Sequence, residues 1–322
     1  MFVPVLLFVL GLVLLIKGGD WFVDGAVAIA RRYHIPDILI GATVVSIGTT
    51  IPEVLVSSMA AAYGQSQTAY GNAIGSIICN TALIAAITIA VKPAGNVSTK
   101  SLRLPLGFFF AAAAIYTAVA YTTGYFSRPI GIALLCMFAV YMILTVKKAF
   151  SGTIEVEEEE GEEDEKPMWK SILLLVVGAA VIAVGADLLV DNGKIIAAAL
   201  GVPESVIALT FIALGTSLPE LVTAITSLAK GHSSLSLGNI IGANLFNLVL
   251  VSGTAISINP FTIPADKTIA GMNASLVVDV PLMWFVMLLL SIPAICKGKL
   301  YRFQGIILLT IYFAYVLFQF FL

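Results

Sequence analysis

Two segments of this chain place carboxylate and hydroxyl side chains on one face of a predicted helix. Their spacing is i, i+3, i+4, i+7, which brings all four positions of a segment onto the same face. The members are Ser46, Thr49, Thr50 and Glu53 in the first segment, and Ala213, Thr216, Ser217 and Glu220 in the second. Both segments lie inside apolar stretches. A carboxylate in such a place marks an ion or proton site by default.

Each segment carries a proline directly before its glutamate, Pro52 and Pro219. A proline inside a helix frees a backbone carbonyl about one turn earlier. In lipid that carbonyl needs another partner, and around Ser46 and Ala213 a cation could supply it. The following stretch adds three positions spaced by four, which are all polar in the first copy and include one alanine in the second. They are Asn72, Ser76 and Asn80 in the first copy, and Asn239, Ala243 and Asn247 in the second.

The combined donors are carboxylates, hydroxyls, amides and carbonyls, so nearly every candidate ligand atom is oxygen. Hard cations such as Ca²⁺ and Na⁺ prefer oxygen, and Ca²⁺ takes about 6–8 such ligands. Glu53 and Glu220 together balance the charge of one Ca²⁺. The alternative is that each carboxyl is protonated and only forms a hydrogen bond between helices. The duplicated hydroxyl face favours ion coordination.

The two segments belong to an internal duplication at an offset of 167 residues. Gly18, Asp20 and Asp24 fall on Gly185, Asp187 and Asp191. We interpret these four aspartates as solvated at the membrane interface. The last apolar stretch of each half also matches, at an offset of 174, so that Arg128 and Tyr141 fall on Arg302 and Tyr315.

Composition indicates a polytopic membrane protein. The chain is 59% hydrophobic and 11% charged, against about 25% charged residues in soluble domains. Ten stretches are long enough to cross a bilayer, which takes about 20 residues. They cover roughly residues 2–30, 37–63, 70–91, 104–123, 129–146, 169–198, 204–229, 235–258, 274–295 and 302–322. The predicted fold is therefore all-α, with ten transmembrane helices.

These stretches divide into residues 1–150 and 168–322, each a five-helix repeat, joined by an acidic linker over 151–167. Because five is odd, the repeats enter the membrane from opposite sides, which predicts an inverted repeat with its substrate site near the midplane. Thirteen of the 17 basic residues fall on one side of this topology. That side is predicted to be cytosolic, with both termini outside and the linker inside, in the cell membrane.

Other functional classes have little support in the sequence. The three cysteines are isolated, and the N-terminal run lacks the basic start of a signal peptide. No basic surface remains for nucleic acid, and no nucleophile–base pair lies in a span, so we expect no enzyme. We expect no cofactor and no protein partner; the expected partners are Ca²⁺, Na⁺ and the lipid bilayer.

The paired motifs resemble a known family. GTTIPE and GTSLPE, each followed by a GN-x-x-G-x-x-x-x-N segment (Gly71 to Asn80 and Gly238 to Asn247), are similar to the two alpha repeats of the sodium/calcium exchangers of the calcium/cation antiporter superfamily. The resemblance implies exchange of Ca²⁺ for Na⁺ by alternating access. It implies that Glu53 and Glu220 bind Ca²⁺. It also implies that side chains complete the Ca²⁺ and Na⁺ sites at Thr49, Thr50, Thr216, Ser217, Ser76, Asn80 and Asn247, with backbone carbonyls at Ser46 and Ala213.

Two positions depart from the family pattern. Ala243 stands where the family usually has serine, which predicts a missing Na⁺ ligand. Asn247 stands where potassium-dependent members have aspartate, which argues against K⁺ co-transport. A proton-coupled calcium exchanger is the main alternative, although its members usually lack this Thr-x-x-Pro-Glu pattern. A cation channel is also open, but an inverted repeat favours alternating access over a pore.

Overall fold

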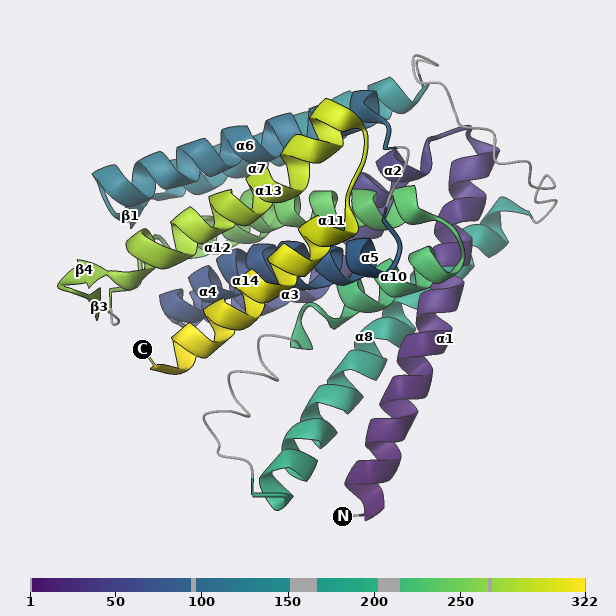
Figure 1. Cartoon of the computed structure of the whole chain (residues 1–322), viewed down its shortest axis with the longest axis horizontal. Coiled ribbons are helices and arrows are strands. Elements are labelled where there is room, and N and C mark those ends of the chain that lie inside the picture. The colour runs from purple at the N-terminus through teal and green to yellow at the C-terminus, as the bar shows by residue number, and fades with distance from the viewer. Residues whose placement is uncertain (1, 94–96, 151–166, 202–214, 266–267, 322) are drawn as a thin grey trace.

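The computed structural model describes residues 2–93, 97–150, 167–201, 215–265 and 268–321 (Figure 1). The first half contains α1 (Phe2–Arg32), α2 (Asp37–Ile40), η1 (Gly41–Val45), α3 (Ser46–Ala62), α4 (Ser66–Cys79), η2 (Asn80–Ala85), α5 (Ala86–Val91), α6 (Thr99–Thr122), β1 (Tyr125–Phe126) and α7 (Arg128–Phe150). The second half contains α8 (Met168–Ala199), α10 (Leu218–Ala229), α11 (Ser233–Phe246), η3 (Asn247–Val251), α12 (Ser252–Ile258), β2 (Phe261–Thr262), β3 (Thr268–Ile269), β4 (Met272–Asn273), η4 (Ser275–Asp279), α13 (Val280–Lys297) and α14 (Arg302–Phe321).

In the described residues, nine helical runs are long and apolar enough to cross a membrane. The shorter apolar helix α10 is the described part of the span predicted over 204–229. The largest difference from the predicted boundaries is in the fourth span, which begins at Thr99 and not near residue 104. There the helix continues past the apolar stretch through a polar first turn. Most of the predicted linker, residues 151–166, lies outside the described residues.

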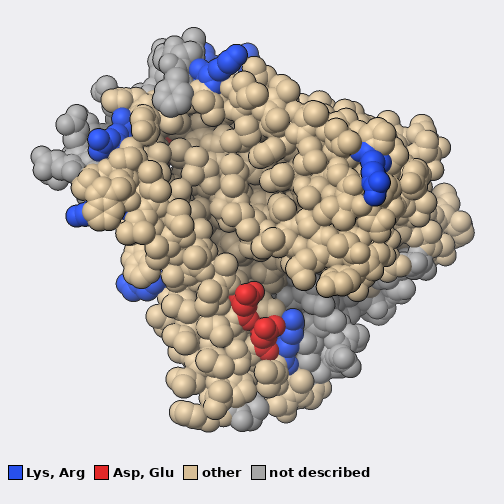
Figure 2. Space-filling model, turned by 180° about the vertical axis from the view of Figure 1, so that it is seen from behind, with Lys and Arg blue, Asp and Glu red and all other residues tan. Residues whose placement is uncertain are grey.

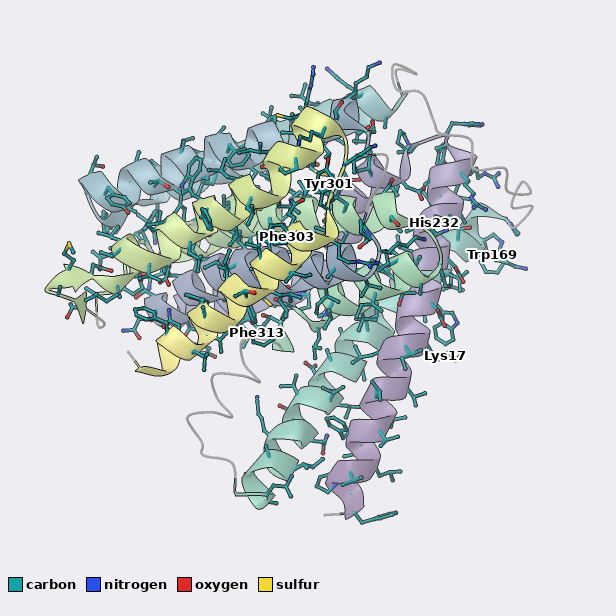
Figure 3. All side chains as sticks on the ribbon, in the orientation of Figure 1. Lys17, Trp169, His232, Tyr301, Phe303 and Phe313 are labelled. Atoms are coloured by element: carbon teal, nitrogen blue, oxygen red, sulfur yellow. The ribbon has the colours of Figure 1, made fainter. Side chains whose placement is uncertain are left out.

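The outer surface of the bundle is apolar, as lipid contact requires. Trp169, Phe303 and Phe313 are exposed, with relative areas of 61%, 72% and 59%, and Figure 3 labels them on α8 and α14. Lys17 projects from α1 in the same view. On the face shown in Figure 2, charged side chains form only small groups among uncharged residues.

Helices α1 and α8 pack side by side through glycines (Figure 1). A Cβ atom on Gly11 would lie 2.8 Å from the Gly185 oxygen, and one on Gly18 would lie 3.0 Å from the Gly178 oxygen. Since the residue number rises along α1 while that of the contacting residue on α8 falls, the two helices are antiparallel. They are also equivalent by the offset of 167, so their opposite directions agree with an inverted repeat.

The fifth helix of each half packs against the other half. A Cβ atom on Gly131 of α7 would lie 2.9 Å from the Gly253 oxygen of α12, and one on Gly305 of α14 would lie 2.6 Å from the Ala86 oxygen of α5. Two further equivalent contacts accompany them, since Arg128 donates to the Ile258 carbonyl and Arg302 to the Val91 carbonyl. The halves are therefore interlocked.

Loop contacts fix which connections share a side of the bundle. Strand β1 pairs with β2, which joins the loop after α6 to the loop after α12. The Val97 amide donates to the Gly298 carbonyl at 2.8 Å, which joins the loop before α6 to the loop after α13. Both pairings require an even number of crossings between their partners, as the ten-span topology predicts.

Candidate functional site

Glu53 and Glu220 lie in the buried centre of the molecule, and both are 0% exposed. Glu53 stands in the middle of α3, whose helix continues through Pro52 without a break. Glu220 stands in the first turn of α10, directly after Pro219. A helix N-terminus favours negative charge, so Glu220 has a stabilising contribution that Glu53 lacks. The prolines thus act differently in the two copies.

Two equivalent hydrogen bonds join the repeats beside the carboxylates. The Thr49 hydroxyl lies 3.2 Å from the Asn239 side-chain oxygen, and the Thr216 hydroxyl lies 3.2 Å from that of Asn72. Thr216 is equivalent to Thr49, and Asn239 is equivalent to Asn72. Each threonine is thus bound by the asparagine of the other half. The offset of 167 shows that these residues are equivalent, but it does not predict that each threonine pairs with the asparagine of the opposite half.

Many buried oxygens at this centre lack a well-aligned hydrogen-bond partner among the described residues. They are Thr50 Oγ1, both carboxylate oxygens of Glu53, Asn80 Oδ1, Ser217 Oγ, both carboxylate oxygens of Glu220 and Asn247 Oδ1. Buried polar atoms in native proteins are nearly always satisfied, and exceptions point to a missing water or ion. Both halves contribute to this set in equal number. Oxygen donors of these types are the ligands that hard cations prefer.

The two asparagines Asn80 and Asn247 each begin a π-helical segment, η2 and η3. Such segments are rare and concentrate at functional sites, because the wider turn changes the hydrogen bonding of the backbone. The Asn247 amide donates to the Ala243 carbonyl at 3.0 Å, which leaves its oxygen unpartnered. Equivalent asparagines thus occupy equivalent local structures.

The remaining predicted positions have different surroundings. The Ser46 hydroxyl donates to the Gly41 carbonyl at 2.7 Å and lies 2.9 Å from the Asn239 carbonyl oxygen. The Ser46 carbonyl lies 3.4 Å from the Thr49 hydroxyl. Ser76 is buried on α4, and Ala243 is fully buried on α11. Ala213 lies outside the described residues.

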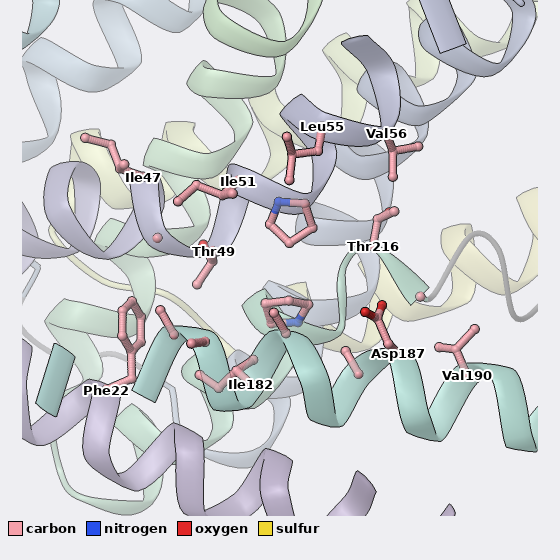
Figure 4. Close-up of a pocket in the computed structure, with 18 of the residues that line it drawn as sticks. Phe22, Ile47, Thr49, Ile51, Leu55, Val56, Ile182, Asp187, Val190 and Thr216 are labelled. Atoms are coloured by element: carbon pink, nitrogen blue, oxygen red, sulfur yellow. The ribbon is translucent and has the colours of Figure 1, made fainter. Parts of the chain in front are cut away.

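A cavity of about 770 Å³ leads to this centre between α3 and α8. Thr49 and Thr216 form part of its lining, and apolar side chains such as Phe22 and Leu55 form most of the rest (Figure 4). Asp187, Asp191 and Lys194 line it along α8. Asp187 and Asp191, which were expected to be solvated at the interface, line the same cavity as Thr49 and Thr216.

Comparisons with known proteins agree over the whole chain. The family model described as sodium/calcium exchanger protein matches residues 3–147 and 170–321. A putative antiporter, CaxA, of Alkalimonas amylolytica is 35% identical over 98% of both chains. The sodium/calcium exchanger MaX1 of Methanosarcina acetivorans is 29% identical over 98% of both chains. An uncharacterized membrane protein of Methanocaldococcus jannaschii is 34% identical over 95% of this chain and 94% of that one.

The structure is also similar to a solved one. The sodium-calcium exchanger NCX_Mj, soaked with 2.5 mM Na⁺ and 10 mM Sr²⁺, has a TM-score of 0.80, with 32% identity over 97% of both chains. This match, together with the two segments of the family model, confirms the predicted all-helical membrane fold with two repeat halves. The exact division at 1–150, 151–167 and 168–322 remains a prediction.

Proposed function

This chain belongs to the sodium/calcium exchanger family, and from that premise we propose that it exchanges Ca²⁺ for Na⁺ across the membrane by alternating access. The family is one of cation transporters, so the prediction of a multi-pass membrane antiporter and not an enzyme is confirmed. The ions and the ligands are the proposal. The observation that carries it is the set of unpartnered buried oxygens contributed by both halves.

The charge and number of these oxygens suit both ions. Glu53 and Glu220 provide two negative charges for one Ca²⁺, and the amide and hydroxyl oxygens raise the number of donors toward the 6–8 that Ca²⁺ takes. Without a cation, two ionised carboxylates at this depth would be strongly unfavourable. The same site accepts Na⁺ when Ca²⁺ leaves. Competition for shared ligands is how one site couples two opposite fluxes.

An asymmetry between equivalent surfaces supports alternating access. Leu55 of α3 and Ala186 of α8 line the open cavity. Their equivalents, Val222 of α10 and Gly19 of α1, are in tight contact, since a Cβ atom on Gly19 would lie 2.7 Å from a Val222 methyl carbon. Lys230 also binds Asp24 at 2.6 Å on that side. Among the described residues, a cavity lies on one approach to the site and the equivalent approach is tightly packed.

The direct test is Ca²⁺ uptake into proteoliposomes. We expect purified protein to take up radioactive Ca²⁺ when Na⁺ is loaded inside and diluted outside, and to take up little without that gradient. Replacing the Na⁺ gradient by a pH gradient distinguishes the runner-up, a proton-coupled antiporter. Uptake that needs no counter-ion gradient would indicate a channel and contradict the proposal.

The orientation is a further part of the proposal. Basic residues gather on the side of the bundle that contains the α10–α11 turn, and this side is proposed to be cytosolic. In a variant without native cysteines, Lys147→Cys should react with an impermeant thiol reagent only from the cytosol, and Thr123→Cys only from outside. The reverse pattern would invert the topology.

A further inference from the structure

The α3–α4 end of the first half and the equivalent α10–α11 end of the second half are packed with different kinds of side chain. Ala60 of α3, Ala69 of α4 and Ala255 of α12 pack together in a small buried cluster with Ala61. Ala60 stands seven residues after Glu53, so the cluster closes the α3–α4 end of the molecule, about 10 Å along the helix from the carboxylate. Its four members are all alanines, and the Asn259 amide donates to the Ala61 carbonyl at 3.0 Å beside them.

At the positions equivalent to three of these alanines, the other half of the chain carries hydroxyl side chains. Ala60, Ala69 and Ala255 are equivalent to Ser227 of α10, Ser236 of α11 and Thr88 of α5. Helix α10 packs against α11 as α3 packs against α4, and it touches α5 more lightly than α3 packs against α12. Ser227, Ser236 and Thr88 have exposed fractions of 0%, 2% and 6%. The three are called the inner hydroxyl cluster below.

The hydroxyls of this cluster are short of partners. Ser227 Oγ and Ser236 Oγ have none, and the Thr88 hydroxyl donates to the Ala85 carbonyl at 2.8 Å, which leaves its lone pairs available. Several other buried hydroxyls of this chain donate to their own helix. Thr145 donates to the Tyr141 carbonyl at 2.8 Å, and Ser291 to the Met287 carbonyl at 2.6 Å.

A further unpartnered hydroxyl lies between the cluster and the carboxylate. Thr223 Oγ1 is buried without a partner, and it stands three residues after Glu220 and four before Ser227, on the same face of α10. Its equivalent in the first half is Val56. A line of unpartnered buried oxygens thus runs along α10 from the exchange site toward the α10–α11 turn. On α3 the equivalents of Thr223 and Ser227 are Val56 and Ala60, and the buried hydroxyl between them, Ser57, already accepts a hydrogen bond from Asn72.

We propose that Thr88, Ser227 and Ser236 form a second, weaker cation site, which takes a partly hydrated Na⁺ between the exchange site and the α10–α11 end of the molecule. Unpartnered buried hydroxyls call for a water or an ion. None of these three side chains is a carboxylate, so a singly charged ion that keeps part of its water suits them better than Ca²⁺. The role as a step on the exchange path rests on the proposed function.

The test replaces the inner hydroxyl cluster by the alanines found at the equivalent positions of the α3–α4 end. The variant Thr88→Ala/Ser227→Ala/Ser236→Ala copies side chains that already pack in the equivalent place, so its fold should be retained, which size-exclusion chromatography checks. We expect Na⁺-driven Ca²⁺ uptake to slow by about tenfold, as the loss of one stabilised intermediate predicts. Equilibrium Ca²⁺ affinity, measured by calorimetry, should stay within about twofold, because Glu53 and Glu220 remain.

A matched control removes three hydroxyls that are already satisfied. Thr145→Ala/Thr254→Ala/Ser291→Ala loses only hydrogen bonds to the residues' own helices and should transport at the wild-type rate. A wild-type rate in the inner variant, or a Ca²⁺ affinity that falls in step with its rate, would overturn the proposal. The second result would mean that the cluster only supports the exchange site.

A binding measurement separates this site from the proposed function. In Glu53→Gln/Glu220→Gln protein the exchange site is disabled, and ²³Na line broadening should still report weak Na⁺ binding that the inner triple substitution removes. If wild-type protein fails to exchange while this broadening is present, the proposed function fails and the inner site stands. If broadening does not depend on the three hydroxyls, the inner site is rejected whatever the transport result.

Discussion

Asn72 and Asn239 occupy equivalent positions but have different surroundings. The Asn72 amide donates to the Ser57 hydroxyl at 2.9 Å and to the Glu53 carbonyl at 3.2 Å. The Asn239 amide has no partner among the described residues, and the equivalent of Ser57 is Ala224. Both asparagines accept a hydrogen bond from a threonine of the other half. The first half-site is therefore braced within its own repeat, and the second is held mainly from across the interface.

This difference indicates a division of roles. Asn72 is held through both its amide and its oxygen. Asn239 is held only through its oxygen, which accepts from Thr49 at 3.2 Å. The unpartnered hydroxyls of α10 add to the looseness of the second half. Segments that move are drawn from the less tightly held parts of a structure, so the second half-site is expected to yield first during exchange.

The largest effect should come from the carboxylates, where the halves are alike. Glu53→Gln and Glu220→Gln each keep the side-chain volume and remove one charge from the proposed Ca²⁺ site. We expect each to reduce Na⁺-dependent Ca²⁺ uptake by more than about 100-fold with folding intact. Substantial uptake in either variant would show that the two glutamates are not equivalent and that the substituted one is not a ligand.

The asparagines should differ in what they contribute to stability. Asn72→Ala loses two donated bonds and leaves Ser57 and Thr216 with fewer partners, so we expect a loss of about 2–3 kcal/mol in the free energy of unfolding. Asn239→Ala loses only accepted bonds and should cost about 1 kcal/mol. Thermal unfolding in detergent compares the two. Equal losses would show that bracing by Ser57 is unimportant.

The missing partner of Asn239 can be supplied. Ala224→Ser places a hydroxyl where Ser57 lies in the first half, and it should stabilise the protein by about 1 kcal/mol if the new bond forms. If looseness of the second half serves exchange, the same variant should slow Ca²⁺ uptake. The matched change Ser57→Ala should lower stability by a similar amount. A stabilised variant with an undiminished rate would separate bracing from transport.

The smallest expected effect concerns Ala243, the equivalent of Ser76. A methyl group offers no oxygen to Na⁺, whereas Ca²⁺ retains both glutamates. Ala243→Ser is expected to raise apparent Na⁺ affinity by about two- to fivefold, a modest gain for one neutral ligand, and to change Ca²⁺ affinity less. Na⁺ activation curves of Ca²⁺ uptake measure both. An unchanged curve would mean that position 243 does not contact Na⁺ in this protein.

Much of the architecture follows from local pattern. The apolar stretches predict the spans because a helix is the one way for a single segment to satisfy its backbone in lipid, and the predicted boundaries shift most where Thr99 begins a polar first turn. The duplicated Glu53 and Glu220 faces predict a shared polar centre. The positions of these side chains were predictable; their role as ion ligands stays a prediction.

The hydrogen-bond partners of these side chains could not be predicted from local pattern. Nothing in the spacing of Asn72 and Asn239 says that each binds a threonine of the opposite half, or that only one has a satisfied amide. The same holds for Ser227 and Ser236, which look like ordinary span hydroxyls until their burial and lack of partners are known. Spacing along one helix is set by the chain, because 3.6 residues make a turn. Contacts between helices of different halves are set only when both halves pack, since each side chain then takes the partner that packing brings within reach.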